Sequence, residues 1–497
     1  MFEPKKALEV VKRHKVKTAV AIAVAAVISQ PIIKLATYSV DINPVHLAKK
    51  QEYLSNIEAQ QPELQKLERP NIVLMVLDDM GYSDLSSYGS KAIKTPNIDK
   101  LAEYGLRFTN YYTGASSSTP SRAAMMTGRY PIRNGLAGVV WPSDHPIINI
   151  NKFYDLNTYL PTDEVVIAEP MKAAGYSTAM IGKWHLGDVK DARPHNMGFE
   201  QFYGALYSND MDPFEIYDKD DIAIPAPVDQ TKLNDAYFDK ASEYIESFDD
   251  NKPFFMYFAH SFPHVPLFVP EEELGKSDAG LYGDVMSDID NSVGEMIEKL
   301  KAEGKYENTI FIITSDNGPW FDGDAGDARG RKFESFDGGQ RVPFIVSWPD
   351  KIKEGKVIDS LLNGVDVFPT LLSYAGIDVP QDRRMDGLDI ASLFAGDEEA
   401  YREQYGERFI YYYGGKVIEG VRGDRFKYRG EVGIYSNDMS KTVSIKQMRP
   451  SHLYDYEYDT REAYDVTEKH PEAAANMKAI LDKENVELAA NPRGWID

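Results

Sequence analysis

The chain has 497 residues, of which 43% are hydrophobic and 27% are charged. This is the composition of a soluble globular protein with enough residues for one large core and a smaller one. A formal net charge of −23 argues against general nucleic-acid binding, because the phosphate backbone demands a basic surface. The absence of cysteine excludes disulfides, thiolate metal sites and a cysteine nucleophile. Because the net charge is so negative, any site for an anionic substrate must gather its positive charge locally.

The N-terminus carries a basic stretch followed by the apolar run "TAVAIAVAAVIS" at residues 18–29. A membrane-spanning helix needs roughly 20 apolar residues, so this run is short for a stable span. A basic segment followed by an apolar run of this length is typical of a secretory signal. We therefore expect residues 1–36 to be a signal peptide and the protein to be exported, periplasmic or secreted. An uncleaved N-terminal membrane anchor is the alternative.

Residues 37–68 are polar and charged with scattered apolar side chains, and we expect a helical lead-in there. After it, short apolar runs recur between amphipathic stretches, one of which (residues 285–304) has a helical pattern. Near-continuous apolar strands that alternate with helices indicate a sheet buried on both faces. We therefore predict an α/β catalytic domain over residues 69–395, with a large, mostly parallel sheet sandwiched by helices. Its predicted strands are residues 72–77, 177–182, 254–259, 309–314 and 342–348.

The pattern changes after residues 393–408. Three close-set segments with glycine between them, residues 409–415, 416–423 and 424–430, are typical of short antiparallel strands. Residues 470–490 have a helical pattern. We predict a smaller antiparallel α+β domain over residues 396–497.

Polar side chains follow four of the predicted strands at the point where each strand ends. Ligands of open α/β sheets bind beyond the carboxyl ends of the strands, so these side chains are candidates for a site. Asp and Asn are also common turn residues, but two strand ends here each carry adjacent oxygen donors. Such an all-oxygen set suits a hard cation, Ca²⁺ or Mg²⁺. The residues are Asp78 and Asp79; Lys183, Trp184 and His185; His260 and His264; and Asp316 and Asn317.

One further segment, "STPSRAAMMTGR" from residue 118, resembles the signature of the sulfatase family, which belongs to the alkaline phosphatase superfamily. That signature reads Cys or Ser, any residue, Pro-Ser-Arg, three residues, Leu or Met, then Thr-Gly-Arg. The resemblance extends in order through "VLDDMGYSD", "GKWHLG", "FPHVPL", "TSDNGPW" and "RKFESFDGGQRVPF". It covers most of residues 71–471.

The resemblance implies a sulfuric ester hydrolase, arylsulfatase-like, whose site residues map onto this chain one by one. Ser118 would be oxidised to formylglycine, whose hydrated aldehyde is the nucleophile, by a serine-type maturating enzyme. Arg122 and Lys183 would hold the hydrated aldehyde with His185 as the base, and Arg129 would support the loop. His264 and Lys332 would bind the sulfate and assist the leaving oxygen. One Ca²⁺ or Mg²⁺ would be bound by Asp78, Asp79, Asp316 and Asn317.

The residues themselves agree with this assignment. Pro120 suits the first turn of a helix, which would leave Ser118 just before the helix N-terminus, where the free N–H groups and the positive end of the dipole favour an anion. The substrate remains open between aryl and carbohydrate sulfates, and the pocket walls are expected from residues 201–230 and 319–330. His260 is open between a structural and a functional role.

Two alternatives remain at this point. The first is a phosphatase or phosphodiesterase that uses unmodified Ser118. Such enzymes of the superfamily usually hold two metals and have a histidine where this chain has Asn317. The second is an inactive homologue that binds sulfated glycans, although every catalytic position of the motifs is filled here.

Overall fold

The computed structural model describes residues 34–430 and 450–497. The basic and apolar parts of the predicted signal or anchor, within residues 1–33, lie outside the described residues. Among the helices that the structure describes, none is both long enough and apolar enough to cross a membrane.

The centre of the molecule is a ten-stranded sheet with the strand order β11-β2-β10-β9-β1-β8-β4-β5-β6-β7. A two-stranded sheet of β3 (Tyr111–Tyr112) and β12 (Leu362–Asn363) lies apart from it. The strands of the large sheet, in chain order, are β1 Asn71–Leu77, β2 Leu106–Phe108, β4 Ser177–Gly182, β5 Gln201–Gly204, β6 Ile216–Asp218, β7 Asp221–Ile224, β8 Phe254–Ala259, β9 Thr309–Ser315, β10 Phe344–Ser347 and β11 Lys356–Ile358.

The middle of this sheet is parallel, and each flank contains one strand, β10 or β6, that runs in the opposite direction. β9, β1, β8, β4 and β5 pair in parallel, whereas β10 runs antiparallel to both β9 and β2. β6 is antiparallel to β5 and to β7. The five predicted strands are therefore confirmed as β1, β4, β8, β9 and β10, and the α/β fold with them. Because the middle strands are parallel, their carboxyl ends meet at one edge.

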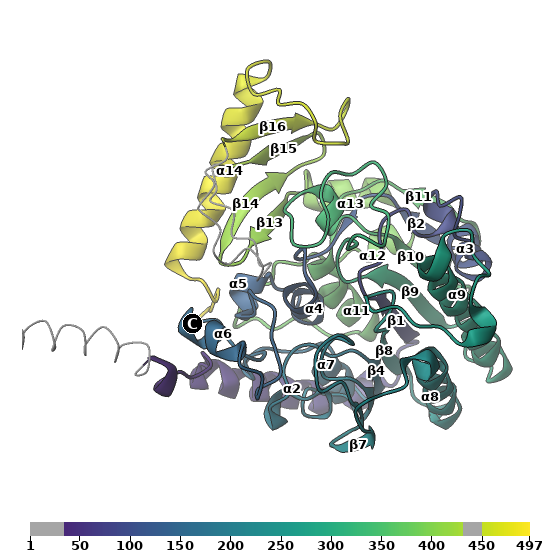
Figure 1. Cartoon of the computed structure of the whole chain (residues 1–497). Coiled ribbons are helices and arrows are strands. Elements are labelled where there is room, and N and C mark those ends of the chain that lie inside the picture. The colour runs from purple at the N-terminus through teal and green to yellow at the C-terminus, as the bar shows by residue number, and fades with distance from the viewer. Residues whose placement is uncertain (1–33, 431–449) are drawn as a thin grey trace, which may run out of the picture.

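Helices cover both faces of the sheet (Figure 1). Because successive side chains of a strand point to opposite faces, those of a middle strand pack into two different cores. In β1, Ile72 and Leu74 pack on the side of α2, α4, α7 and α11, and Val73 and Met75 pack on the side of α3, α8 and α9. The helices are α2 Pro44–Leu64, α3 Pro96–Tyr104, α4 Ser118–Thr127, α5 Pro131–Asn134, α6 Ile148–Phe153, α7 Ala168–Ala173, α8 Leu233–Ser247, α9 Gly280–Ala302, α10 Asp337–Gln340, α11 Val367–Ala375, α12 Ala391–Phe394, α13 Glu398–Tyr405 and α14 Pro471–Ala490.

The C-terminal part forms the small antiparallel sheet that the sequence predicts. Its strands β13 (Ile410–Gly414), β14 (Val417–Arg422), β15 (Phe426–Arg429) and β16 (His452–Asp455) follow one another in order, with α14 packed against them (Figure 1). The core of this sheet also takes in Ala124, Tyr130 and Val365 of the preceding region. The two parts share apolar packing, and the domain limits at residues 36, 68 and 395 stay predictions.

Buried charges also join the small sheet to α10, the short helix before β10. Asp337, at the start of α10, is fully buried and accepts hydrogen bonds from the hydroxyls of Tyr112 and Tyr412, both at 2.7 Å. Lys427 of β15 lies 3.2 Å from Asp337 and 2.5 Å from Glu462. We call Asp337, Lys427 and Glu462 the interdomain cluster. It anchors the loop that carries Lys332, five residues before Asp337, to the C-terminal sheet.

We predict that Asp337→Asn lowers the free energy of unfolding by about 3–5 kcal/mol. Asp337 is paired both with Lys427 and with buried Arg422, at 3.4 Å. Its loss therefore leaves two buried cations with the single carboxylate of Glu462 and one positive charge uncompensated. Urea unfolding of both proteins measures the change. The matched control is Asp424→Asn, in the exposed turn before β15, which should stay within about 0.5 kcal/mol of the wild type. An equal loss in both variants would contradict a stabilising role for the interdomain cluster.

Candidate active site

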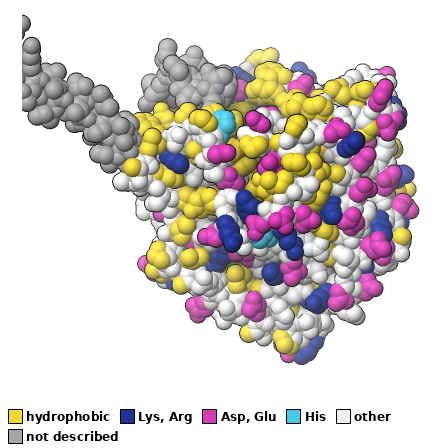
Figure 2. Space-filling model, turned by 60° about the horizontal axis from the view of Figure 1, so that its bottom comes forward, with side chains coloured by type: hydrophobic (Ala, Val, Ile, Leu, Met, Phe, Trp, Pro, Cys, Tyr) yellow, Lys and Arg dark blue, Asp and Glu magenta, His cyan; other side chains and the backbone are white. Residues whose placement is uncertain are grey.

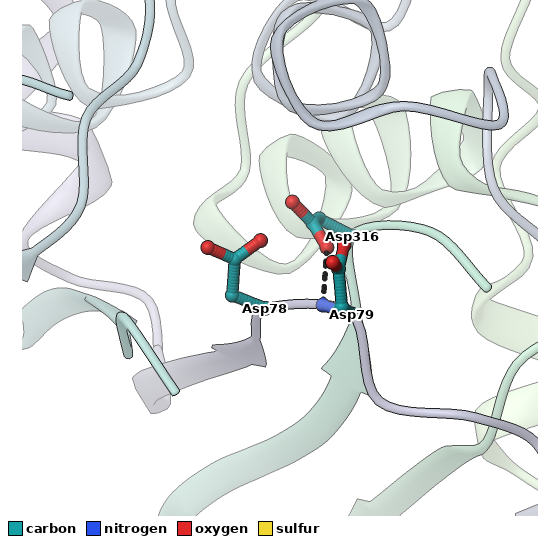
Figure 3. A group of neighbouring side chains, drawn as sticks. All are labelled: Asp78, Asp79 and Asp316. Atoms are coloured by element: carbon teal, nitrogen blue, oxygen red, sulfur yellow. Dashed lines mark hydrogen bonds between the residues drawn. The ribbon is translucent and has the colours of Figure 1, made fainter. Parts of the chain in front are cut away.

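Two neighbouring strands bring four oxygen donors to the same edge of the sheet. Asp78 and Asp79 follow β1, and Asp316 and Asn317 lie at the end of β9. β1 and β9 are paired in register to their last residues, so the two dipeptides lie side by side. Each of the three aspartates offers a carboxylate oxygen, and these oxygens lie within 4.8 Å of one another (Figure 3). Within the described residues this is the only such group of three or more candidate ligands.

The backbone at this edge is held by hydrogen bonds between the two dipeptides. The N–H of Asp79 donates to Asp316 Oδ1 at 3.1 Å, the dashed line in Figure 3. The side-chain amide of Asn317 donates to Asp79 Oδ1 at 2.7 Å, which leaves its own Oδ1 on the other side of the group. Asp79 has a positive φ of 64°. Such strain in a non-glycine residue persists only where the surroundings fix it, and it recurs here at His185 and Phe333.

Three basic side chains neutralise the three carboxylates. All six groups are at most 8% exposed. The three basic side chains come from α4, from the turn after β4 and from the loop before α10, so distant parts of the chain meet at this edge. The pairs and their N···O distances are Lys183–Asp78 at 2.5 Å, Lys332–Asp79 at 2.8 Å and Arg122–Asp316 at 2.9 Å. We call these six side chains the charge cluster.

The pKa values in the charge cluster show that the charges are kept despite burial. Burial alone would raise the pKa of Asp78, but Lys183, His264 and Arg122 hold it well below its usual range. For Asp79, Lys332 and His264 likewise outweigh burial and lower the pKa. Burial lowers the pKa of Lys183, an effect that Asp78 opposes. The formal charges of the six groups cancel.

Ser118 contacts the charge cluster at the Asp78–Lys183 pair. Its hydroxyl donates to Asp78 Oδ1 at 3.1 Å or to Asn317 Oδ1 at 3.3 Å, and it accepts from Lys183 Nζ at 3.3 Å. The side chain is 3% exposed. Ser118 is the first residue of α4, so the expectation that it lies just before the helix was one residue off. Pro120 lies in the first turn, as predicted.

A glycine at the end of β4 lets Lys183 reach this point. Gly182 has a φ of +93°, and a Cβ there would lie 1.9 Å from the carbonyl oxygen of Ala259. Only glycine fits this close approach. The N–H of Lys183 then bonds to the same carbonyl at 2.7 Å, and its side chain turns toward Asp78.

His185 is neutral and has a free ring nitrogen. Its Nε2 lies 3.1 Å from the carbonyl oxygen of Val140, which can only accept, so Nε2 carries the hydrogen. Nδ1 has no hydrogen-bond partner among the described residues and keeps its lone pair. Burial, together with the charges of Lys183 and Arg122, lowers the pKa of His185 well below 6.5. The arrangement is that of a base.

His264 approaches the charge cluster at the Lys332–Asp79 pair. It lies five residues after β8, and its Nε2 is 3.7 Å from Asp79 Oδ2, the oxygen that Lys332 also contacts. Its Nδ1 faces away, toward Asn209 Oδ1 at 3.0 Å. Asn209 was not singled out in the sequence, because no motif marks it and its partner is 55 residues away.

Three other residues of the motifs point elsewhere. His260 has both ring nitrogens occupied, by the N–H of Phe262 at 2.8 Å and by Asn234 Oδ1 at 3.1 Å, and burial lowers its pKa to about 3. These contacts favour a structural role. Trp184 is fully buried and bonds to a carbonyl. Arg129 lies beyond the end of α4 and pairs with Glu164 at 3.1 Å.

Of the ten residues assigned to the site, nine form one network of contacts. His185 lies beside it, close enough to Lys183 and Arg122 for their charges to lower its pKa. The nine are Asp78, Asp79, Ser118, Arg122, Lys183, His264, Asp316, Asn317 and Lys332.

Comparisons with known proteins agree with this geometry. A protein-family model described as sulfatase matches residues 70–377. A second, described as N-sulphoglucosamine sulphohydrolase, C-terminal, matches residues 331–489.

Individual relatives extend the match over most of the chain. The N-acetylgalactosamine-6-sulfatase of Canis lupus familiaris is 34% identical over 72% of this chain and 71% of its own length. The arylsulfatase A of Homo sapiens is 33% identical over 80% of this chain and 83% of its own. The solved PsFucS1 sulfatase from Pseudoalteromonas sp. superposes with a TM-score of 0.73 at 25% identity, covering 92% of this chain and 96% of that one. The chain belongs to the sulfatase family and is an enzyme that hydrolyses sulfate esters.

Proposed function

We propose that this sulfatase releases sulfate from carbohydrate sulfate esters, using an oxidised Ser118 and one divalent cation, Ca²⁺ or Mg²⁺. The observation that carries the proposal is the position of Ser118, whose hydroxyl lies within hydrogen-bond distance of Asp78, Asn317 and Lys183. A carbohydrate substrate is supported by the relative named for N-acetylgalactosamine 6-sulfate.

The donor set fits a single hard cation. Asp78, Asp79, Asp316 and Asn317 offer only oxygen, the donor that Ca²⁺ and Mg²⁺ prefer. Among the described residues no thiolate or imidazole belongs to this ligand group, and His264 Nε2 approaches it only to 3.7 Å from Asp79 Oδ2. Since the charge cluster is already neutral, a bound divalent ion would leave it with a formal charge of +2. The ion would supply the positive charge that draws in a sulfate anion despite the acidic exterior.

The chain's own residues divide between two sides of Ser118. Lys183 and Arg122 lie on the side of Asp78 and would hold the oxygens at position 118. His185 Nδ1, unprotonated and unpartnered among the described residues, would accept a proton there. His264 Nε2 and Lys332 Nζ converge on Asp79 Oδ2 and would contact the ester oxygen that leaves with the sugar.

A serine hydroxyl is a weak nucleophile at neutral pH and needs activation. Oxidation of Ser118 to formylglycine would supply a hydrated aldehyde as the nucleophile. This proposal requires a partner, a serine-type sulfatase-maturating enzyme. Its support is the signature at residues 118–129, in which serine occupies the modified position.

The phosphatase alternative finds less support in the geometry. A two-metal site needs a second set of ligands, whereas Asn317 donates its amide to Asp79 and turns its only acceptor toward Ser118. A sulfated-glycan-binding protein without activity would not need the unpartnered base at His185. The hydrolase function fits both observations.

We also propose that the protein is exported, to the periplasm or outside the cell, with residues 1–36 as a cleaved signal or an N-terminal anchor. The basic stretch followed by residues 18–29 supports this. Nucleic acid is not a proposed partner, because the net charge is −23. On the face shown in Figure 2, lysine and arginine side chains are intermixed with acidic ones.

We predict one Ca²⁺ or Mg²⁺ per chain and no zinc, measured by elemental analysis of the purified protein. Asp316→Asn should lower kcat/KM at least about 100-fold, since even residues behind metal ligands cost 10–100-fold when changed. Asp350→Asn, an exposed aspartate, is the control and should retain activity. Two zinc ions per chain would contradict the single-cation site.

We predict that Ser118 alone is oxidised, while Ser116, Ser117 and Ser121 stay as encoded. Trypsin should release the peptide of residues 108–122 with all four serines, and the modified form should lack two hydrogens. Fragment masses of protein made with and without a serine-type maturase would locate the change.

Protein made without the maturase should carry plain Ser118, bind the cation, and hydrolyse 4-nitrophenyl sulfate little or not at all. Full activity from a preparation with entirely unmodified Ser118 would contradict the formylglycine mechanism and favour the phosphatase-like alternative.

A further inference from the structure

Asn209 holds the segment that carries His264 at three points. It lies in the connection between β5 and β6 and is 3% exposed. Its Oδ1 contacts His264 Nδ1 at 3.0 Å. Its Nδ2 donates to two backbone carbonyls of the same segment, those of Pro266 at 3.0 Å and of His264 at 3.4 Å. Ring and backbone of His264 are thus both tied to a different loop.

The orientation of the Asn209 amide is fixed by these contacts. Backbone carbonyls only accept hydrogen bonds, so the nitrogen of the amide must face Pro266 and His264. Gln230 adds to this, since its Oε1 accepts from Asn209 Nδ2 at 3.0 Å. The orientation of the Gln230 amide is itself fixed, because its Nε2 donates to the backbone carbonyl of Asn209 at 3.1 Å. The Asn209 side-chain oxygen must therefore face the imidazole.

This orientation decides which nitrogen of His264 faces the charge cluster. An amide oxygen accepts, so Nδ1 must donate and carries a hydrogen. The carbonyl of Val265, 2.6 Å from Nδ1, also requires a hydrogen on Nδ1, because it can only accept. Val265 is the next residue, however, and moves with His264. Asn209 is the contact that links the ring to another loop, and it leaves Nε2 directed at Asp79 Oδ2.

We infer that Asn209 is a positioning residue: it fixes the rotation of the His264 ring so that Nε2 meets the leaving oxygen of the ester. The inference rests on the proposed function, in which His264 assists that oxygen. Because Nδ1 keeps its hydrogen in the bond to Asn209, the proton that Nε2 passes to the leaving oxygen is the second proton of the imidazolium, and the ring is left neutral with its hydrogen on Nδ1. Asn209 itself contacts the imidazole and the backbone of the 264–266 segment, and acts on the reaction only through His264.

A second histidine–asparagine pair in the same region serves as an internal comparison. His260, four residues earlier, contacts Asn234 Oδ1 through Nε2, and the Asn234 amide donates to Ser292 Oγ at 2.9 Å. Both asparagines are 3% exposed. Asn234 lies on α8 and Ser292 on α9, and within the described part of the chain the hydrogen bonds of His260 and Asn234 include none to a side chain of the charge cluster. The Asn234 pair therefore matches the burial of the Asn209 pair without its contact to Asp79.

The experiment compares Asn209→Leu with the matched control Asn234→Leu in the metal-loaded, matured enzyme. Leucine has the same branched shape and number of side-chain heavy atoms as asparagine, and it removes both the acceptor and the donor of the amide. The substrates form a series of phenyl sulfates from 4-nitrophenyl, a good leaving group, to 4-methoxyphenyl, a poor one. Thermal unfolding and cation content show whether each variant is folded, and Asn209→Ser is the second variant if Asn209→Leu does not fold.

Asn209→Leu should lower kcat/KM about 100-fold for 4-methoxyphenyl sulfate and less than about fivefold for 4-nitrophenyl sulfate, since proton transfer to a poor leaving group contributes about 10²–10⁴-fold. Asn234→Leu should lower both rates by the same factor. Equal losses of kcat/KM across the series for Asn209→Leu would overturn the inference. A larger loss for the poor leaving group than for the good one in Asn234→Leu would overturn it as well. A wild-type enzyme that hydrolyses neither the phenyl sulfates nor a sulfated sugar such as N-acetylgalactosamine 6-sulfate would instead contradict the proposed function.

Discussion

Three ionised carboxylates buried together at one sheet edge repel one another strongly unless positive charge is buried with them. This requirement explains why α4, the turn after β4 and the loop before α10 all meet beyond the ends of β1 and β9. Each contributes one basic side chain, Arg122, Lys183 or Lys332, to one carboxylate. The strained backbone of Asp79, the close packing at Gly182 and the anchoring of the Lys332 loop to the C-terminal sheet all serve this arrangement.

Much of the fold was predictable because the middle strands are buried on both faces. Such strands appear in the sequence as unbroken apolar runs, so β4 and β8 were placed to the residue and β1 and β9 to within one. The site was predictable for a related reason. Parallel strands bring their carboxyl ends to one edge, and the polar residues directly after them, Asp78, Asp79, Asp316 and Asn317, had to meet there.

The rest depended on contacts that a linear sequence does not contain. The flanking strands β2, β5, β6, β7 and β11 have only three or four residues each, and the antiparallel direction of β10 leaves no mark on its composition. His260 and His264 follow the same strand, yet one is enclosed by Asn234 and the other is aimed at Asp79 by Asn209. Their partners come from other parts of the chain, so spacing alone could not separate the two histidines.

We propose that the neutral charge cluster becomes a sulfate site when it takes up one divalent cation. The direct test is calorimetric titration of inorganic sulfate into protein freed of metal with a chelator, and into the same protein reloaded with Ca²⁺. We expect the cation to raise the affinity for sulfate about tenfold or more, within the usual range of coupling between two sites. Equal affinity for sulfate with and without the cation would contradict it.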